Sequence, residues 1–415
     1  MAEYADREHY LPVRKSDLVE LLCNDTSLSS ADRDAFRQFC KLIAAVFHFE
    51  YHQRLESLKD TYAPFDPDCV TKPLTTLSAE ERPHKLDELF RQFEALMERA
   101  NFKKVDDAVL AEANSQASQV GLQMYVDFGL FEKLAAYSRG EAVGTRILRH
   151  WLWFWRKRKV DVPLFQRLAV IAKMRKDRRL GSDVDTNCVY LKIFKDVPRM
   201  DVEMLLPGAR LRMPGFQRLK MGGSWIGGLA YLVYSLSTEV FEAVTRGLWY
   251  VIYGPLLAFL GYGYKQWYGY QSTKTAYGLR LSQSLYYQTL DSNAGVIHHL
   301  LDEAEEQDCR EALLAYYYLR HADESGWTSA ELDDYVEASL EKLTGLKFDF
   351  EIGDAIAKLE RHKLIERVGD RYRAMPLAKA LVLLDYAWDN YFNYSNCLPS
   401  SNTLEPGRLR LTNDQ

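Results

Sequence analysis

MGGSWIGGLAYLVYSL (Met221–Leu236) and GLWYVIYGPLLAFLGYGY (Gly247–Tyr264) are two uncharged apolar runs near the centre of the chain. As α-helices, these runs of 16 and 18 residues would rise roughly 24 and 27 Å, just short of the ~30 Å hydrocarbon core of a bilayer. Basic residues flank both outer ends, namely Arg218, Lys220 and Lys265, and polar aromatic rings gather near the ends. The pattern predicts a membrane hairpin of two helices. The alternative is a pair of core helices in a soluble domain.

The composition of the 415-residue chain is that of a folded protein, with 47% hydrophobic and 27% charged residues. Its formal net charge of -5 argues against a dedicated nucleic-acid binder, which usually carries a basic domain. Six scattered cysteines form no CxxC pair, and the N-terminus has no apolar signal segment. We therefore expect a protein of the cytoplasmic (inner) membrane that is multi-pass with two helices and has its soluble regions in the cytoplasm.

The hydrophobic periodicity divides the chain into regions on either side of this hairpin. A spacing of three and four residues predicts helices over Ser16–Asp60 and from a cap at Ser78 to about Ala100. From about Val120 the period changes to that of strands. The predicted fold class is α+β, with N-terminal helices, an antiparallel sheet, the hairpin and a C-terminal helical region. The five predicted regions are 1–115 (helical), 116–210 (antiparallel β), 211–270 (hairpin), 271–395 (helical, with a winged-helix-like unit) and 396–415 (disordered tail).

The winged-helix-like unit is predicted from a capping box at Thr328 and Glu331 and from a hairpin turn at Gly369-Asp370. Such units often bind DNA. The presumed recognition helix, however, carries Asp349, Glu351, Asp354 and Glu360 against Lys358 and Arg361. Because these carboxylates would repel phosphate, we expect no nucleic-acid binding here but a structural or protein-contact role. The acidic run at residues 302–308 is interpreted as a solvated helix face.

The most informative polar cluster lies in YLKIFKDVPRMDVEMLLPG, directly before the hairpin. Its charged residues are Lys192, Lys195, Asp196, Asp201 and Glu203. We expect a strand that carries the two lysines and then Asp196 as the cap of a short helix. Two lysines and several carboxylates could bind a metal or phosphate, or act as acid and base. The alternative, which we favour, is an ion-paired corner with a structural role.

No nucleotide-binding, metalloprotease or serine-hydrolase motif occurs in the sequence. No catalytic residue, cofactor or metal site is therefore predicted. The leading hypothesis is a non-enzymatic, membrane-anchored scaffold or regulatory protein that binds membrane lipid and either a protein partner or further copies of itself. Gly223 and Gly227 have the spacing for close helix contact in the hairpin. The competing hypothesis is an enzyme or lipid-handling protein that uses the charged cluster before the hairpin.

Several segments together resemble one known family. They are HYLPVRKSDLVELL, the YAPFDPD turn, YLKIFKDVPRMDVEMLLPG, the Gly-rich hairpin and SLYYQTLDSNAGVIHHLLDEAEEQDCREALLAYYYL. The chain thus resembles, from about His9 to Tyr394, the uncharacterised family of bacterial, plant and animal proteins that includes transmembrane protein 143, with its domain of unknown function 3754. The resemblance implies an intact member of one family with a membrane hairpin. It implies no catalytic residue.

The structural interpretation of the charged cluster can be tested by the substitution Asp201→Ala. We expect a loss of roughly 1–3 kcal/mol in the free energy of unfolding, because the partner of the carboxylate is left unpaired. We expect no separable loss of activity. A folded, equally stable variant that fails to complement a deletion strain would instead indicate chemistry at this site.

Overall fold

The computed structural model describes most of the chain. The described residues are 3–4, 11, 13–24, 28–71, 74, 77–106, 123–149, 157–177, 180, 184–199, 202, 205–206, 210–212, 230, 233–234, 253–322, 325–345, 350 and 352–392. They group into two compact units, each built from segments that are distant in the sequence. The first unit comprises residues 1–5, 59–98 and 102–299, and the second comprises residues 6–58, 99–101 and 300–415. The five consecutive regions given above stay a prediction.

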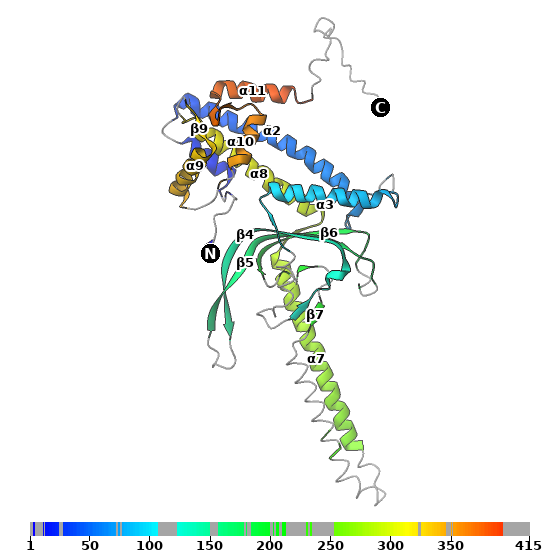
Figure 1. Cartoon of the computed structure of the whole chain (residues 1–415). Coiled ribbons are helices and arrows are strands. Elements are labelled where there is room, and N and C mark those ends of the chain that lie inside the picture. Colours follow the sequence, from blue (N-terminus) through cyan, green and yellow to red (C-terminus); the bar gives the residue numbers. More distant parts are fainter. Residues whose placement is uncertain are drawn as a thin grey trace, which may run out of the picture. The chain divides into compact units, whose positions relative to one another are not determined.

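An antiparallel sheet forms the centre of the first unit (Figure 1). Its main strands run in the order β1-β4-β5-β6-β8, and β2 pairs with β4. Their bounds are Glu3–Tyr4 (β1), Lys103–Lys104 (β2), Phe131–Arg149 (β4), Lys157–Met174 (β5), Val189–Pro198 (β6) and Thr289–Ser292 (β8). A separate pair joins β3 (Gln123–Tyr125) to β7 (Arg210–Arg212). Every described pairing is antiparallel, so the predicted α+β class with an antiparallel sheet is confirmed.

Helix α3 (Glu81–Arg99) covers part of this sheet and begins where the sequence predicts a cap. The Ser78 hydroxyl accepts a hydrogen bond from the Glu81 amide at 3.2 Å, and the Glu81 carboxylate accepts one from the Ser78 amide at 3.0 Å. The apolar face of α3 then packs inward, with the Phe93 and Tyr137 ring centroids 5.9 Å apart. Short 3-10 turns occur at Ala63–Phe65 (η1) and Phe128–Leu130 (η2).

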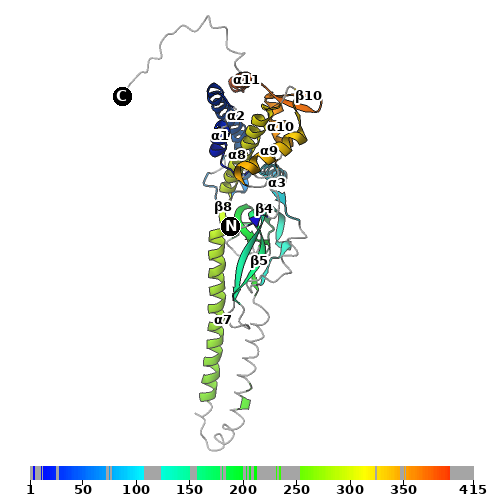
Figure 2. The ribbon, with the colours of Figure 1, turned by 90° about the vertical axis from the view of Figure 1, so that its left-hand side faces the viewer.

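Helix α7 (Tyr253–Gln288) corrects the membrane prediction. It does not end after the second apolar run but continues as one helix well beyond Tyr264, through Lys265 and several glutamines (Figure 2). The described part of the apolar run, from Tyr253, is therefore only the beginning of a longer, more polar helix. Among the residues that the structure describes, no helix is both long and apolar enough to cross a membrane. The prediction of a two-helix, multi-pass protein of the inner membrane is contradicted.

The first apolar run can be followed at only a few positions. Ala230, Val233 and Tyr234 are helical, and the rest of Met221–Leu236 lies outside the described residues. Residues 235–252, which include the start of the second run, also lie outside them. The predicted disordered tail at 396–415 lies outside them as well.

The second unit is mainly helical. Its helices are α1 (Lys15–Cys23), most of α2 (Ser30–Tyr62) and of α8 (Ala294–Leu319), α9 (Ser329–Thr344), α10 (Ile352–Arg361) and α11 (Leu377–Asp389). A small sheet of order β10-β11-β9 joins Ile365–Val368 (β10), Arg371–Ala374 (β11) and Trp327–Thr328 (β9). Aromatic rings fill the core between α2 and α8, where the centroids of Phe39 and Tyr316 stack 4.1 Å apart.

Two local signals in this unit form as the sequence predicts. Thr328 and Glu331 make the full capping box at the start of α9. Val368 pairs with Arg371, so Gly369 and Asp370 form a two-residue turn between β10 and β11, with Gly369 at φ 72°. The start of α9 and the turn between β10 and β11 were therefore predicted correctly from the sequence.

A matched pair of glycine substitutions can test the packing of the small sheet. Gly326 has φ 71°, and a Cβ there would lie 2.7 Å from the Tyr372 carbonyl oxygen; Gly369 has φ 72° but open space around it. We expect Gly369→Ala to cost about 1 kcal/mol from backbone strain alone. We expect Gly326→Ala to cost at least ~2–3 kcal/mol, because the clash adds to that strain. Equal losses in urea unfolding would contradict the geometry at Gly326.

Candidate functional site

A buried cluster of charges lies in the second unit, and helix α8 supplies half of it. Asp308 and Glu311 are three residues apart and therefore lie on the same face of α8. Both are almost fully buried, as are their neighbours Gln307 and Arg310. Four consecutive or nearly consecutive polar side chains inside a core are unusual, since such groups are rarely buried unless each has a partner.

Helix α10 supplies the other half of the cluster. Asp354 and Lys358 are four residues apart on α10, a spacing that favours an ion pair. Lys358 lies between the buried side chains of Ala355 and Leu359, and only 2% of its own side chain is exposed. The periodicity of α10 therefore places a cation on its apolar face.

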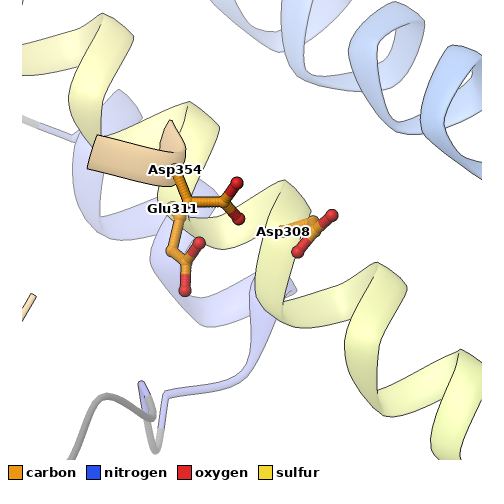
Figure 3. Close-up of side chains that lie close together, drawn as sticks. All are labelled: Asp308, Glu311 and Asp354. Carbon is orange, nitrogen blue, oxygen red and sulfur yellow. The ribbon is translucent and has the colours of Figure 1, made fainter. Parts of the chain in front are cut away.

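The Lys358 ammonium group lies at the point where the three carboxylates converge. Its Nζ atom is 2.7 Å from Asp308 Oδ1, 3.1 Å from Glu311 Oε2 and 2.5 Å from Asp354 Oδ2. Figure 3 shows the three carboxylates facing the same region, two from α8 and one from α10. An ammonium group has three N–H donors, so each of them can serve one carboxylate. We call Lys358, Asp308, Glu311 and Asp354 the ion network.

A further layer of hydrogen bonds connects the ion network to α2 and to the N-terminal segment. The Tyr51 hydroxyl of α2 donates to Asp308 Oδ2 at 2.6 Å. Gln307 Nε2 donates to Glu311 Oε1 at 2.6 Å, and Gln307 Oε1 accepts from the Leu11 amide at 3.2 Å. The network therefore joins four segments of this unit, and the polar atoms named here are all paired.

The electrostatics of the network follow from its burial. Burial raises the pKa of Glu311 to about 7, against the opposing effect of Lys358 and with a further increase from Asp308. Burial alone would lower the pKa of Lys358, but the three carboxylates outweigh it and hold that pKa above its ordinary value. Lys358 is thus charged at neutral pH, whereas Glu311 titrates near neutrality.

The three carboxylates are also the groups that could hold a cation. One oxygen of each lies within 4.8 Å of the others, which is the spacing that a metal ion requires. Lys358 Nζ, however, is within hydrogen-bonding distance of all three, so the chain already places a cation among them. The arrangement therefore fits an internal ion network better than a metal centre. In chemical terms it can hold helices together and exchange a proton.

The charged cluster predicted before the apolar hairpin is only partly described. Lys192, Lys195 and Asp196 all lie on β6 and are exposed. Because neighbouring side chains alternate across a strand, Lys192 and Lys195, three residues apart, lie on opposite faces of the sheet. Asp201 and Glu203, like Gly223 and Gly227 of the predicted helix contact, lie outside the described residues.

Asp196 differs from its expected role as a helix cap. Strand β6 continues through it to Pro198, and Asp196 adopts a left-handed backbone with φ 52°. Its carbonyl oxygen accepts a hydrogen bond from Gln288 Nε2 at the end of α7, at 3.3 Å. The residue thus connects the strand to that helix through its backbone.

Sequence reasoning missed the ion network because it assigned charged residues to solvent. Asp308 was expected on a solvated helix face, yet it is buried. The signals were present: Lys358 falls between Ala355 and Leu359 on the apolar stripe of α10, and Asp308 and Glu311 directly precede the apolar segment ALLAYYYL. A lysine in an apolar stripe predicts a buried acid elsewhere, but not which one.

Comparisons with known proteins cover another part of the chain. Residues 142–295 match the family model described as "Protein of unknown function (DUF3754)". This stretch, from β4 to the start of α8, therefore belongs to that family, which confirms the predicted membership of a family of unknown function. The narrower resemblance to transmembrane protein 143 stays a prediction. No solved structure matches the chain.

The raised pKa of Glu311 predicts how stability depends on pH. Between its ordinary pKa of 4.5 and about 7, the folded chain holds a proton on Glu311 that the unfolded chain releases. The free energy of unfolding should therefore fall as pH rises through this window, by up to about 1.4 kcal/mol per pH unit from this group. In Glu311→Gln, which cannot ionise, this contribution should disappear. Lys358 adds no slope here, since its raised pKa matters only above pH 10.5.

Urea unfolding of both proteins from pH 5 to pH 8 would measure the difference. Glu306→Gln is the matched control, because Glu306 lies on the same helix but is 41% exposed, with its carboxylate 3.8 Å from Lys15 Nζ. The control should keep the pH dependence of the original chain. The same slope in Glu311→Gln as in the original chain would contradict the assignment.

Proposed function

We propose that this chain, which carries a domain of a family of unknown function, is a non-enzymatic scaffold or regulatory protein that binds a protein partner. We further propose that residues 294–374 form a winged-helix-like unit that serves protein contact rather than nucleic-acid binding. The orientation of Lys358 is the observation that carries this proposal.

The order of elements supports the winged-helix interpretation. Helix α8 is followed by β9, α9, α10 and then the hairpin β10–β11, and β9 pairs with β11 to complete a three-stranded sheet. In such a unit α10 occupies the place of the recognition helix, and the hairpin occupies the place of the wing. The family match does not extend over these residues, so the interpretation depends on topology alone.

The charge distribution on α10 argues against contact with phosphate. A recognition helix presents lysine and arginine to the nucleic acid. Lys358 instead points into the ion network, and Arg361 Nη1 lies 3.6 Å from Glu50 of α2. The exposed positions of α10 include Gly353, Ala357 and Glu360. Arg361 is exposed as well, but it lies beside the Glu50 carboxylate, so the outer face of this helix offers phosphate one acid and one arginine that already has an acidic neighbour.

Helix α11 supports a protein partner. Val382 and Tyr386 are four residues apart on one face of α11 and are 68% and 66% exposed. Phe392, which follows the helix, is also exposed, and its ring packs edge-on against Phe49 with centroids 5.4 Å apart. Aromatic side chains are enriched in protein interfaces, because they bury a large area and lose little entropy.

The alternative function is an enzyme or lipid-handling protein that uses Lys192, Lys195, Asp196, Asp201 and Glu203. An active site of this kind would need these groups to converge in one cleft. The three that the structure describes are exposed on a single strand, with the lysines on opposite faces. The alternative therefore has less support.

Binding to a labelled DNA duplex, followed by fluorescence anisotropy, tests the exclusion of nucleic acid. We expect a dissociation constant weaker than about 10⁻⁴ M at physiological salt, the weak limit of non-specific binding. Tight binding that falls steeply with added salt would overturn the proposal. In the same experiment, Glu360→Lys should gain affinity if α10 is exposed as described.

A photo-crosslinking amino acid in place of Tyr386, introduced into the full chain in its natural host, tests the protein partner. The same probe in place of Glu360 is the control on a charged face. We expect a discrete crosslinked protein from position 386 and none from position 360. Crosslinks from position 360 but not from position 386 would show that the partner does not bind at α11, which would contradict the proposal.

A further inference from the structure

Strands β4 and β5 continue together as a two-stranded ribbon beyond the other strands of the sheet. Strand β6 accompanies β5 only up to Leu164, and β1 accompanies β4 only up to Val143. Past these positions, residues 144–149 of β4 pair with residues 157–162 of β5 and, among the described strands, with no other. We call these two stretches the basic arm, which projects from the sheet in Figure 1. At roughly 3.3 Å per residue the arm is about 20 Å long.

The charge of the basic arm is almost entirely positive. Its cations are Arg146, Arg149, Lys157, Arg158 and Lys159, against one acid, Asp161. The arm therefore has a net charge of +4, whereas the formal net charge of the whole chain is -5. Glu141, the acid that precedes the arm on β4, has a cation of its own outside the arm, because its Oε1 atom lies 3.6 Å from Arg199 Nη2.

The register of the arm places like charges opposite each other. Arg149 pairs with Lys157 across the two strands at the end of the ladder. The next two cations on β5, Arg158 and Lys159, are neighbours in the sequence and fall on opposite faces of the ribbon. Like charges directly opposite each other destabilise an antiparallel pair, and a two-stranded ribbon is only marginally stable in water. An anionic partner would remove this repulsion, so the sequence of the arm suits a bound state better than an isolated one.

The simplest alternative explanation of these cations is the protection of exposed strand edges. Natural sheets often place charged side chains, lysine above all, on an edge, so that two edges do not pair with each other. Either sign of charge has this effect, however, and a mixture of signs would avoid the repulsion between Arg149 and Lys157. Edge protection therefore explains why the arm is charged, but not why nearly all of its charge is positive.

The sequence between the two strands indicates which anionic partner the arm would bind. Residues 150–156 read HWLWFWR, with three tryptophans, a leucine and a phenylalanine in seven positions. Tryptophan prefers the interface of a bilayer, where its ring has apolar surroundings and its N–H group stays near water. Lysine and arginine beside such rings are attracted to anionic lipid headgroups. A nucleic-acid duplex offers phosphates to the cations, but its backbone gives leucine and phenylalanine no apolar layer.

From the register, the charge and this composition, we infer that the basic arm binds the surface of a bilayer that contains anionic lipids. The arm belongs to the first unit, so the inference is independent of the protein partner proposed for α11. Surface binding needs no helix that crosses the bilayer, and it is therefore consistent with the helices that the structure describes. Near an anionic surface each lysine or arginine contributes roughly fivefold to the affinity, and salt weakens this contribution by screening the charges.

Flotation of the full chain with phosphatidylcholine vesicles, with and without phosphatidylserine, tests the inference. We expect binding only to the vesicles that contain phosphatidylserine, and weaker binding as salt is added. Arg149→Gln combined with Lys157→Gln should lower this affinity roughly 25-fold, at about fivefold for each cation. The same variant should not lower the free energy of unfolding, because it also removes the repulsion between the two strands. Lys103→Gln combined with Lys104→Gln, which changes two exposed lysines on β2 of the same sheet, is the matched control and should bind as the original chain does.

An environment-sensitive fluorophore on an introduced cysteine gives a second measurement that leaves these cations in place. In a background with Cys69, Cys188 and Cys397 replaced by serine, a label at Leu148→Cys should become brighter when phosphatidylserine vesicles are added. A label at Lys104→Cys on β2 should not. Equal binding to vesicles without phosphatidylserine, an unchanged affinity after Arg149→Gln with Lys157→Gln, an equal response of both labels, or binding to a labelled DNA duplex at least as tight as to the vesicles would each overturn the inference.

Discussion

The second unit depends on the burial of one ammonium group. Removing the charge of Lys358 from water is costly, and that cost is recovered only if carboxylates and good geometry surround it. Three carboxylates do so at 2.5–3.1 Å. Because any other rotation or register of α10 against α8 would leave the ammonium without carboxylates and two buried acids without a cation, the network fixes how these helices pack. Its main contribution is therefore to the choice of one arrangement rather than to overall stability.

The burial of Lys358 also determines which charged and apolar side chains this unit exposes to a binding partner. A network with one ammonium and three carboxylates would carry an excess of negative charge if all were ionised, and the raised pKa of Glu311 relieves part of it. Lys358, which on another face of α10 would be in solvent, instead pairs with carboxylates inside the core. The outer surface is left with small residues, Glu360 and Arg361 on α10, the latter beside Glu50, and with apolar side chains on α11. The core packing of this unit and the proposed preference for a protein partner over nucleic acid thus depend on the same burial of Lys358.

The parts of the fold that were predictable from sequence are those with local causes. The capping boxes at Ser78 and Thr328 and the turn at Gly369-Asp370 each depend on a few adjacent residues. The extent of α7 was not predictable in this way, because hydropathy measures composition, whereas a helix ends only where backbone capping or proline stops it. No such stop follows Tyr264, and a single lysine there does not end a helix. The ion network was missed because its half on α8 lies 43 to 50 positions from its half on α10, and no local pattern pairs the two halves.

Helices α10 and α7 depart from the usual partition of polar and apolar groups in opposite ways. Helix α10 buries a charge, and helix α7 exposes aromatic rings. The first departure is resolved inside the chain, since every donor of Lys358 has an acceptor. The second is met only partly, by contacts between the rings themselves: the Tyr264 centroid lies 6.2 Å from that of Trp267 and 6.4 Å from that of Tyr268. Leu285 near the end of α7 packs into the sheet core. A buried charge must find its partners within the fold, whereas an exposed tyrosine ring is tolerated more easily, because its polar tip stays in water.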